Sequence, residues 1–331
     1  MVPRPVLPLL LAALALAAPG CGSRGPEALP AAAEPASSPP ATAAPAGTLV
    51  PVGFKPEGVV ADPRTGLVAV GLREPDELAL IDGATGEVRR RVALPAAPRH
   101  LALGDRSVLV PAEDADALVT VRLPGGRATE TPTGDEPHDA AEAAGRTFVA
   151  DEFADRLSVL GHGTIRVADQ PGGITSLNRG RQIAVVAVRA RVIETFDAAT
   201  GRRTGSAPAG VGPTHVVSDG GDYLFVTDTA GGALLVFHLR PRLELIRRYP
   251  LPGSPYGIAI DNRRHRIFVT QTARNRLTEL IAGGRPSLVA RYPTPRQPNT
   301  VAVDEATGRV YVTGKVDGVL QLLDPARERT R

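Results

Sequence analysis

The side chains of this sequence that are best suited to chemistry stand one or two residues after a recurring proline. Six of them carry imidazole, carboxylate or guanidinium groups: Glu57, Arg99, His100, His138, Asp139 and His215. Imidazoles and carboxylates from separate segments can hold a divalent metal and leave positions open for substrate. The same groups can act as general acids and bases. We therefore take these six as candidate ligand-binding residues, provided that the fold brings them together.

Three interpretations of these side chains remain open from the sequence. The first is a ligand-binding site without catalysis. The second is a metal-assisted hydrolase, lactonase or lyase that uses the His, Asp and Glu groups. The third is a set of ordinary solvated polar groups at a channel mouth. The chain has no His-x-x-x-His spacing, glycine-rich phosphate loop or Gly-x-Ser-x-Gly elbow, so we assign no catalytic residue, metal or cofactor.

The prolines recur at intervals of 34 to 43 residues and mark repeating units. They are Pro56, Pro98, Pro137, Pro171, Pro213, Pro255 and Pro298. A short segment with apolar residues at alternate positions follows most of them, and turns rich in Gly and Asp separate it from further short strands. Four strands in about 40 residues are typical of a β-propeller blade. The sequence thus predicts an all-β, seven-bladed β-propeller with the six candidate residues near its central channel.

Two sequence motifs recur within these units. Related strand ends occur at Phe148–Asp151, Phe225–Asp228, Phe268–Gln271 and Arg309–Gly314. The turns Ile81–Gly86 and Phe196–Gly201 both contain Asp-x-x-Thr-Gly. Over about residues 48–324 the chain resembles the YVTN-repeat family of seven-bladed propellers. The resemblance implies the fold and leaves the activity open, because the repeated motif belongs to the scaffold.

The two ends of the repeat region are expected to meet. The seventh unit supplies three strands and then continues into a polar tail, residues 326–331, which does not resemble a strand. A strand-like segment, Thr48–Val52, precedes the first proline. Its pairing with the last strand would complete the seventh blade and remove an exposed sheet edge. We therefore expect a propeller domain over residues 47–325, with the last blade closed by the N-terminal strand.

The first 46 residues have the composition of an export signal and a linker. Residues 1–20 contain Arg4 and then an apolar run that is too short to span a bilayer, as in secretory signals. Cys21, the only cysteine, follows small residues, and the segment resembles a bacterial lipoprotein signal. That resemblance implies lipidation of Cys21, whereas ordinary signal cleavage would leave a free thiol. Residues 21–46 are rich in Ala and Pro, which predicts a disordered tether.

Composition narrows the classes of partner. The chain has no Trp and only 4% aromatic residues, which argues against WD-repeat propellers and Trp-docked quinone dehydrogenases. Its formal charge of +3 gives little support for nucleic-acid binding. We therefore expect an exported, lipid-anchored monomer on the extracytoplasmic side of the membrane. It would act as a binding scaffold for an envelope protein or a small ligand.

Overall fold

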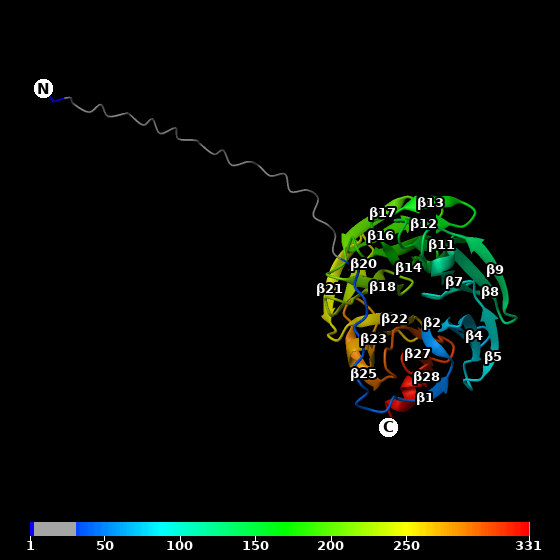
Figure 1. Cartoon of the computed structure of the whole chain (residues 1–331). Coiled ribbons are helices and arrows are strands. Elements are labelled where there is room, and N and C mark those ends of the chain that lie inside the picture. Colours follow the sequence, from blue (N-terminus) through cyan, green and yellow to red (C-terminus); the bar gives the residue numbers. More distant parts are fainter. Residues whose placement is uncertain (3–30, 331) are drawn as a thin grey trace. The chain divides into compact units, whose positions relative to one another are not determined.

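The computed structural model describes residues 1–2 and 31–330, and it places seven four-stranded antiparallel sheets around a common axis (Figure 1). The first three blades are β2 (Phe54–Asp62), β3 (Leu67–Glu74), β4 (Asp76–Asp82) and β5 (Val88–Ala93); β6 (Ala102–Gly104), β7 (Ser107–Ala112), β8 (Ala117–Arg122) and β9 (Arg127–Pro132); and β10 (Pro137–Ala143), β11 (Arg146–Asp151), β12 (Arg156–Val159) and β13 (Gly163–Arg166).

The remaining blades repeat the same order from the axis outward. The fourth, fifth and sixth are β14 (Pro171–Leu177), β15 (Gln182–Ala187), β16 (Val192–Asp197) and β17 (Arg203–Pro208); β18 (Pro213–Ser218), β19 (Tyr223–Asp228), β20 (Ala233–His238) and β21 (Glu244–Pro250); and β22 (Pro255–Asp261), β23 (Arg266–Gln271), β24 (Arg276–Ile281) and β25 (Ser287–Pro293). The seventh is β26 (Val301–Val303), β27 (Val310–Gly314), β28 (Val319–Leu323) and β1 (Thr48–Pro51). The short helices are η1 (Glu113–Ala115), η2 (Thr272–Arg274) and α1 (Pro325–Glu328). The predicted all-β, seven-bladed fold is confirmed.

The seventh blade is completed by β1, so the predicted closure of the ring is also confirmed. β1 pairs antiparallel with β28, with Thr48 opposite Leu322 and Pro51 opposite Val319. This pairing covers the edge of β28, which would otherwise present unpaired backbone groups for association with another chain. After β28 the polar tail starts with the short helix α1, whose first N–H groups bond to the side chain of Asp324.

Local turn chemistry explains how the sequence produces these strands. In the turn after β4, Asp82 Oδ1 accepts hydrogen bonds from the backbone N of Ala84 at 3.0 Å and of Thr85 at 2.9 Å. Gly86 follows with φ 80°, a left-handed conformation that glycine adopts without a steric penalty. The Asp-x-x-Thr-Gly motif at residues 82–86 therefore forms a compact connection between the third and fourth strands of the first blade.

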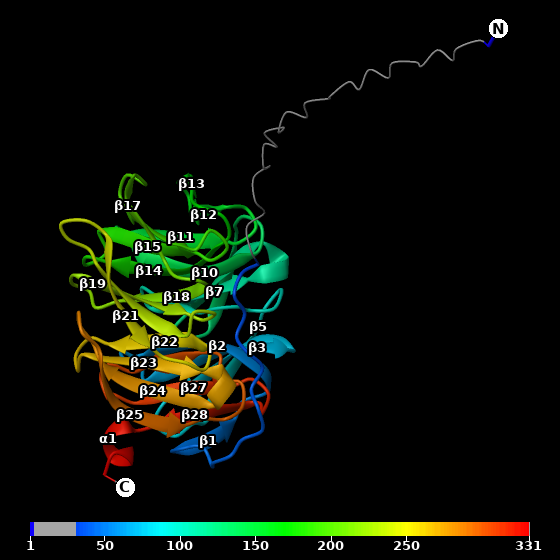
Figure 2. The same ribbon diagram turned by 90° about the vertical axis from the view of Figure 1, so that its left-hand side faces the viewer.

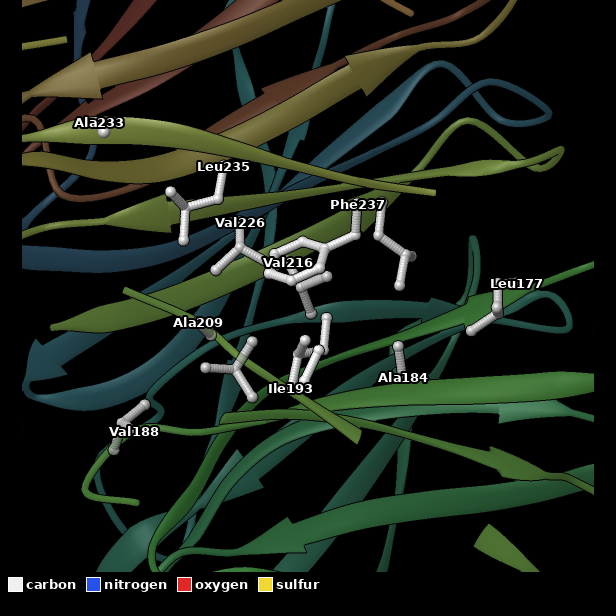
Figure 3. Packing of buried hydrophobic residues seen from close by; sticks show 13 residues of the cluster. Leu177, Ala184, Val188, Ile193, Ala209, Val216, Val226, Ala233, Leu235 and Phe237 are labelled. Carbon is white, nitrogen blue, oxygen red and sulfur yellow. The ribbon is translucent and has the colours of Figure 1, made fainter. Parts of the chain in front are cut away.

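Apolar seams between neighbouring blades form the core. Between the fourth and fifth blades, 13 buried residues make one cluster, shown in Figure 3. Phe237 on β20 has no exposed surface and lies close to Val216 and Val226 in Figure 3. Full burial of a side chain of this size stabilises a fold by about 1.5–3 kcal/mol. The seams therefore supply most of the favourable free energy that holds the blades together.

Residues 31–46, which we call the strap, are ordered against the propeller and lead along one face of the ring into β1 (Figure 2). Ala36 N donates to Ser254 Oγ at 3.0 Å, and Ser38 N donates to Gln297 Oε1 at 2.9 Å. These contacts place the segment on the propeller surface, whereas the composition of residues 21–46 predicts a disordered tether. The composition of the segment does not indicate these contacts, because the partner residues lie 218 and 259 positions away in the sequence.

Most of the predicted export region lies outside the residues that the structure describes. Residues 3–30, which include Cys21, nearly all of the predicted signal and the first part of the predicted tether, are not described. In the ranges 1–2 and 31–330, no helix has both the length and the apolar character needed to cross a membrane.

Candidate functional site

The innermost strand of each blade starts near the axis, and the six candidate side chains stand at or just before these starts. Glu57 lies on β2, His138 and Asp139 on β10, and His215 on β18. Arg99 and His100 lie just before the second blade's innermost strand, β6, with Leu101 between them and the strand. Because neighbouring innermost strands contact one another around the whole ring, side chains at equivalent positions can converge.

Three of the candidate residues, His100, His138 and His215, form a buried cluster although they come from the second, third and fifth blades. His100 Nε2 and His215 Nε2 are 3.0 Å apart. The ring centroid of His100 lies 4.7 Å from that of His138 and 4.4 Å from that of His215. Each side chain belongs to a residue that exposes only 6% to 8% of its surface. We call these three residues the histidine cluster.

A backbone carbonyl fixes the tautomer of His215. Its Nδ1 lies 3.2 Å from the O atom of Tyr256, and a carbonyl oxygen only accepts, so Nδ1 carries the proton. In the neutral ring Nε2 is then an acceptor, and His100 donates to it through Nε2–H. The two rings thus present a proton donor facing a proton acceptor, without any charge.

Burial keeps the three imidazoles neutral. It lowers the pKa of His215 to about 4, despite the opposing hydrogen bond to Tyr256. Burial, and then the adjacent imidazoles, hold the pKa of His100 well below its usual range. Burial and the nearby Arg99 guanidinium do the same to the pKa of His138. At neutral pH the histidine cluster is therefore polar and uncharged.

Arg99 lies next to the cluster, among acidic residues that the sequence analysis missed. Its Nε is 3.4 Å from Glu113 Oε1, and its Nη2 is 3.9 Å from Glu34 Oε2. Glu152 Oε2 lies 3.9 Å from His138 Nε2, and burial raises the pKa of this carboxyl. Glu113 and Glu152 directly follow β7 and β11, the second strands of their blades. That repeated position is the sequence signal that could have identified them.

The other two candidate residues have partners away from the cluster. Glu57 accepts a hydrogen bond from Asn299 Nδ2 at 2.8 Å and forms an ion pair with Lys315, both in the seventh blade. Asp139 accepts a hydrogen bond from Ile174 N at 3.1 Å, and burial raises its pKa to about 7. Glu57 therefore ties the first blade to the seventh, and Asp139 ties the third blade to the fourth.

Two hollows flank these residues. A cavity of about 290 Å³ runs along the innermost strands and is lined by His100, His215 and Asp139. Its volume is close to the lower end of the range of about 300–1,000 Å³ that is common for small-molecule sites. A groove of about 690 Å³ lies between the strap and two loops of the first and seventh blades. This groove contains Lys55 and Lys315, the only two lysines in the sequence.

The donor atoms of the site do not favour a metal. Among the residues that the structure describes, no group of three or more His, Cys, Asp or Glu side chains is arranged to hold a metal ion. His100 and His215 satisfy each other directly at a hydrogen-bonding distance instead. The metal-assisted interpretation therefore gains no support from this arrangement.

Known proteins share the fold with this chain. No family model and no curated protein matches the sequence. Hydrazine synthase from Kuenenia stuttgartiensis is 16% identical, covers 84% of this chain and 97% of its own, and has a TM-score of 0.73. Virginiamycin B lyase from Staphylococcus aureus is 15% identical with coverages of 84% and 99% and a TM-score of 0.70. A chain of a mitotic checkpoint complex is 10% identical with coverages of 88% and 95% and a TM-score of 0.73. At these identities the likeness establishes the propeller fold, which serves both enzymes and multiprotein assemblies.

Proposed function

We propose that this protein is a non-catalytic β-propeller that binds a small polar ligand at the histidine cluster while a lipid anchors it to the cell envelope. The observation that carries the proposal is the convergence of three buried imidazoles from three blades. Buried polar groups stabilise a fold less than well-packed apolar side chains of similar size. A polar axis inside an otherwise apolar ring is what recognition of a ligand requires.

The cavity next to the cluster offers a ligand both kinds of hydrogen-bonding group. His100, His215 and Asp139 are among the residues that line it, and the pKa of the Asp139 carboxyl is about 7. Near neutral pH this carboxyl exists in both protonation states, so it can donate or accept a proton in a hydrogen bond. A few convergent polar groups in a cavity of this size fix the orientation of a small molecule.

Thermal-shift screening of the purified full chain against a panel of sugars, amino acids and small organic acids tests this proposal. We expect at least one compound class to raise the melting temperature of the wild type and to lose this effect in the His100→Leu variant. The matched control is His162→Leu, because His162 lies exposed in a turn between β12 and β13. The proposal would be overturned if a compound raised the melting temperatures of His100→Leu and His162→Leu equally. It would also be overturned if no compound raised the melting temperature of the wild type or of His162→Leu.

The lipid anchor depends on the sequence of the N-terminal region. The apolar run in residues 1–20 and the single Cys21 after small residues support it. Expression of the full chain in a bacterial host with a labelled fatty acid should label the wild type and move it into the detergent phase. The Cys21→Ser variant should remain unlabelled and aqueous. Labelling of that variant, or an unlabelled wild type, would contradict the anchor.

A lyase activity is the second candidate, and the His100–His215 pair favours it. The carbonyl of Tyr256 accepts a hydrogen bond from Nδ1–H of His215 and so leaves Nε2 as the acceptor, which is the arrangement of a positioned general base. The solved lyase structures include one of an inactive virginiamycin B lyase variant with quinupristin. Incubation of the wild type with quinupristin, followed by chromatography, tests this candidate. A product that is absent with His215→Ala would replace the non-catalytic proposal.

A further inference from the structure

The strap passes close to the side chain of Arg99. Upstream of Glu34, Ala32 packs against the apolar seam between the fourth and fifth blades. Downstream, Ala36 and Ser38 are hydrogen-bonded to the loops that precede β22 and β26. Glu34 is thereby held between two anchor points, with its carboxylate 3.9 Å from Arg99 Nη2. The position of this carboxylate follows from the strap.

The guanidinium of Arg99 has hydrogen-bonding capacity that its neighbours leave unused. Within the described residues, its Nε is buried and has no hydrogen-bond partner. Glu113 approaches Nε at 3.4 Å, but the other oxygen of Glu113 is bound by Arg73 at 2.8 Å. The 3.9 Å contact between Arg99 and Glu34 is also longer than the distance of about 2.7–2.9 Å that is usual for charged N–H···O pairs. A buried donor without a partner destabilises the protein, and an incoming acceptor removes that cost.

We infer that Arg99 is a carboxylate-binding subsite on the strap side of the histidine cluster, separate from the cavity lined by His100, His215 and Asp139, and that Glu34 is the chain's own weak occupant of this subsite. The inference goes beyond the proposed function by adding a second binding position and the chemical class that it takes. The side chain of Glu34 is 69% exposed whereas that of Arg99 is 21% exposed, so the competing carboxylate leaves by moving into water. A ligand carboxylate can then form the two parallel hydrogen bonds that a guanidinium offers.

A monoanionic carboxylate fits this position better than a phosphate. Glu113 and Glu152 lie near Arg99, and Glu152 contributes to the electrostatic environment of its guanidinium. Two charges on one ligand would meet repulsion from these carboxylates. The neutral imidazoles of the histidine cluster add hydrogen-bonding groups without adding charge. The ligand is therefore a small organic acid with one carboxylate directed at Arg99.

The test compares melting temperatures of full-length variants over a series of sodium acetate concentrations, with sodium chloride holding the ionic strength constant. We expect acetate to bind Glu34→Gln with an apparent Kd about 1.4- to fivefold lower than the wild type, since a partly exposed ion pair of about 0.2–1 kcal/mol has been removed. The matched control is Glu244→Gln, a 53% exposed carboxylate on β21 paired with Arg242. Its apparent Kd should equal that of the wild type.

Two further arms separate the subsite from general charge effects. Arg99→Lys keeps the positive charge but loses the planar guanidinium that can form two parallel hydrogen bonds with a carboxylate. Acetate binding should therefore weaken in this variant, with or without Glu34→Gln. Inorganic phosphate should stabilise Glu34→Gln less than acetate does. Equal acetate affinity in Glu34→Gln and Glu244→Gln, or stronger binding of phosphate, would overturn the subsite. If either result occurs while His100→Leu still abolishes ligand protection, the proposed function stands without this subsite.

Discussion

The seam between the fourth and fifth blades and the histidine cluster at the axis are both buried, but they contribute to the protein in opposite ways. The seam consists of 13 apolar residues, and each buried methylene stabilises the fold by about 0.8 kcal/mol. The cluster consists of polar rings that burial forces to stay neutral, and a typical hydrogen bond between such groups adds only about 0.5–1.5 kcal/mol. Stability therefore resides between the blades, which leaves the axis free to carry polar groups.

The largest effect is expected when the ring is opened. Deletion of residues 47–53 removes β1, which pairs with β28 from Thr48 to Pro51. The seams on both sides of the seventh blade then lose their support, and the exposed edge of β28 is available to another chain. We expect unfolding or oligomerisation, measured by light scattering and thermal melting. A monomer with an unchanged melting temperature would show that closure does not hold the seams together.

A single truncation within the seam tests the same comparison at one site. Phe237→Ala removes a side chain with no exposed surface, and we expect a loss of about 3–5 kcal/mol in the free energy of unfolding in urea. Phe153→Ala is the matched control, because Phe153 is 56% exposed. That control should change the free energy by less than about 0.5 kcal/mol. Similar losses in the two variants would contradict the role given to the seam.

The cluster should respond less strongly and in a coupled way. His215→Ala leaves the Nε2–H of His100 without its acceptor, which should cost about 1–3 kcal/mol in the free energy of unfolding at pH 7.5. The double variant His100→Ala, His215→Ala should lose less free energy of unfolding than the two single variants together, because each single change removes the same hydrogen bond. Urea denaturation of the four proteins gives this difference. Strict additivity would mean that the two rings do not interact.

The smallest effect is a change in the pH dependence of stability. The pKa of His215 is about 4 in the folded protein and 6.5 ordinarily, so the unfolded chain binds more protons between these values and stability falls as pH falls. The pKa of Asp139 is raised from 3.8 to about 7, so its contribution falls as pH rises through that window. The two effects oppose each other.

Asp139→Asn removes one of these opposing effects. We expect the free energy of unfolding of this variant to depend more steeply on pH between 4 and 7 than that of the wild type, by at most about 1.4 kcal/mol per pH unit. Urea denaturation at a series of pH values measures the slope. An unchanged slope would mean that Asp139 titrates alike in the folded and unfolded states. His265→Asn is a suitable control, because His265 is exposed.

The fold could be predicted because each of its signals is local and repeated. Each of these signals can be recognised within a few residues of sequence. They are the proline at the start of the innermost strand, the Asp82–Gly86 turn and the strand-like segment Thr48–Val52. The seven blades follow from counting them. The closure follows because an unpaired edge has to be covered.

The site was only partly predictable, because its geometry depends on distances across the ring. The position two residues after the recurring proline identified His100 and His215 as candidates, but their 3.0 Å contact depends on the width of the channel and on side-chain direction. Glu57 has the same position in the repeat as Arg99 and His138, one residue after the proline, yet its partner is Lys315. The docking of Glu34 depends on strap contacts with residues more than 200 positions away, such as Ser254, and no local pattern encodes them.

The distribution of lysine has a practical consequence. Both lysines of the sequence line the groove beside the strap, and their side chains are 52% and 30% exposed for Lys55 and Lys315. Reagents that acylate amines therefore find their side-chain targets on one face of the ring, apart from the α-amino group. A dye, bead or cross-linker attached to a lysine by this chemistry will lie on that face, and all other long basic side chains, being arginines, will stay unmodified.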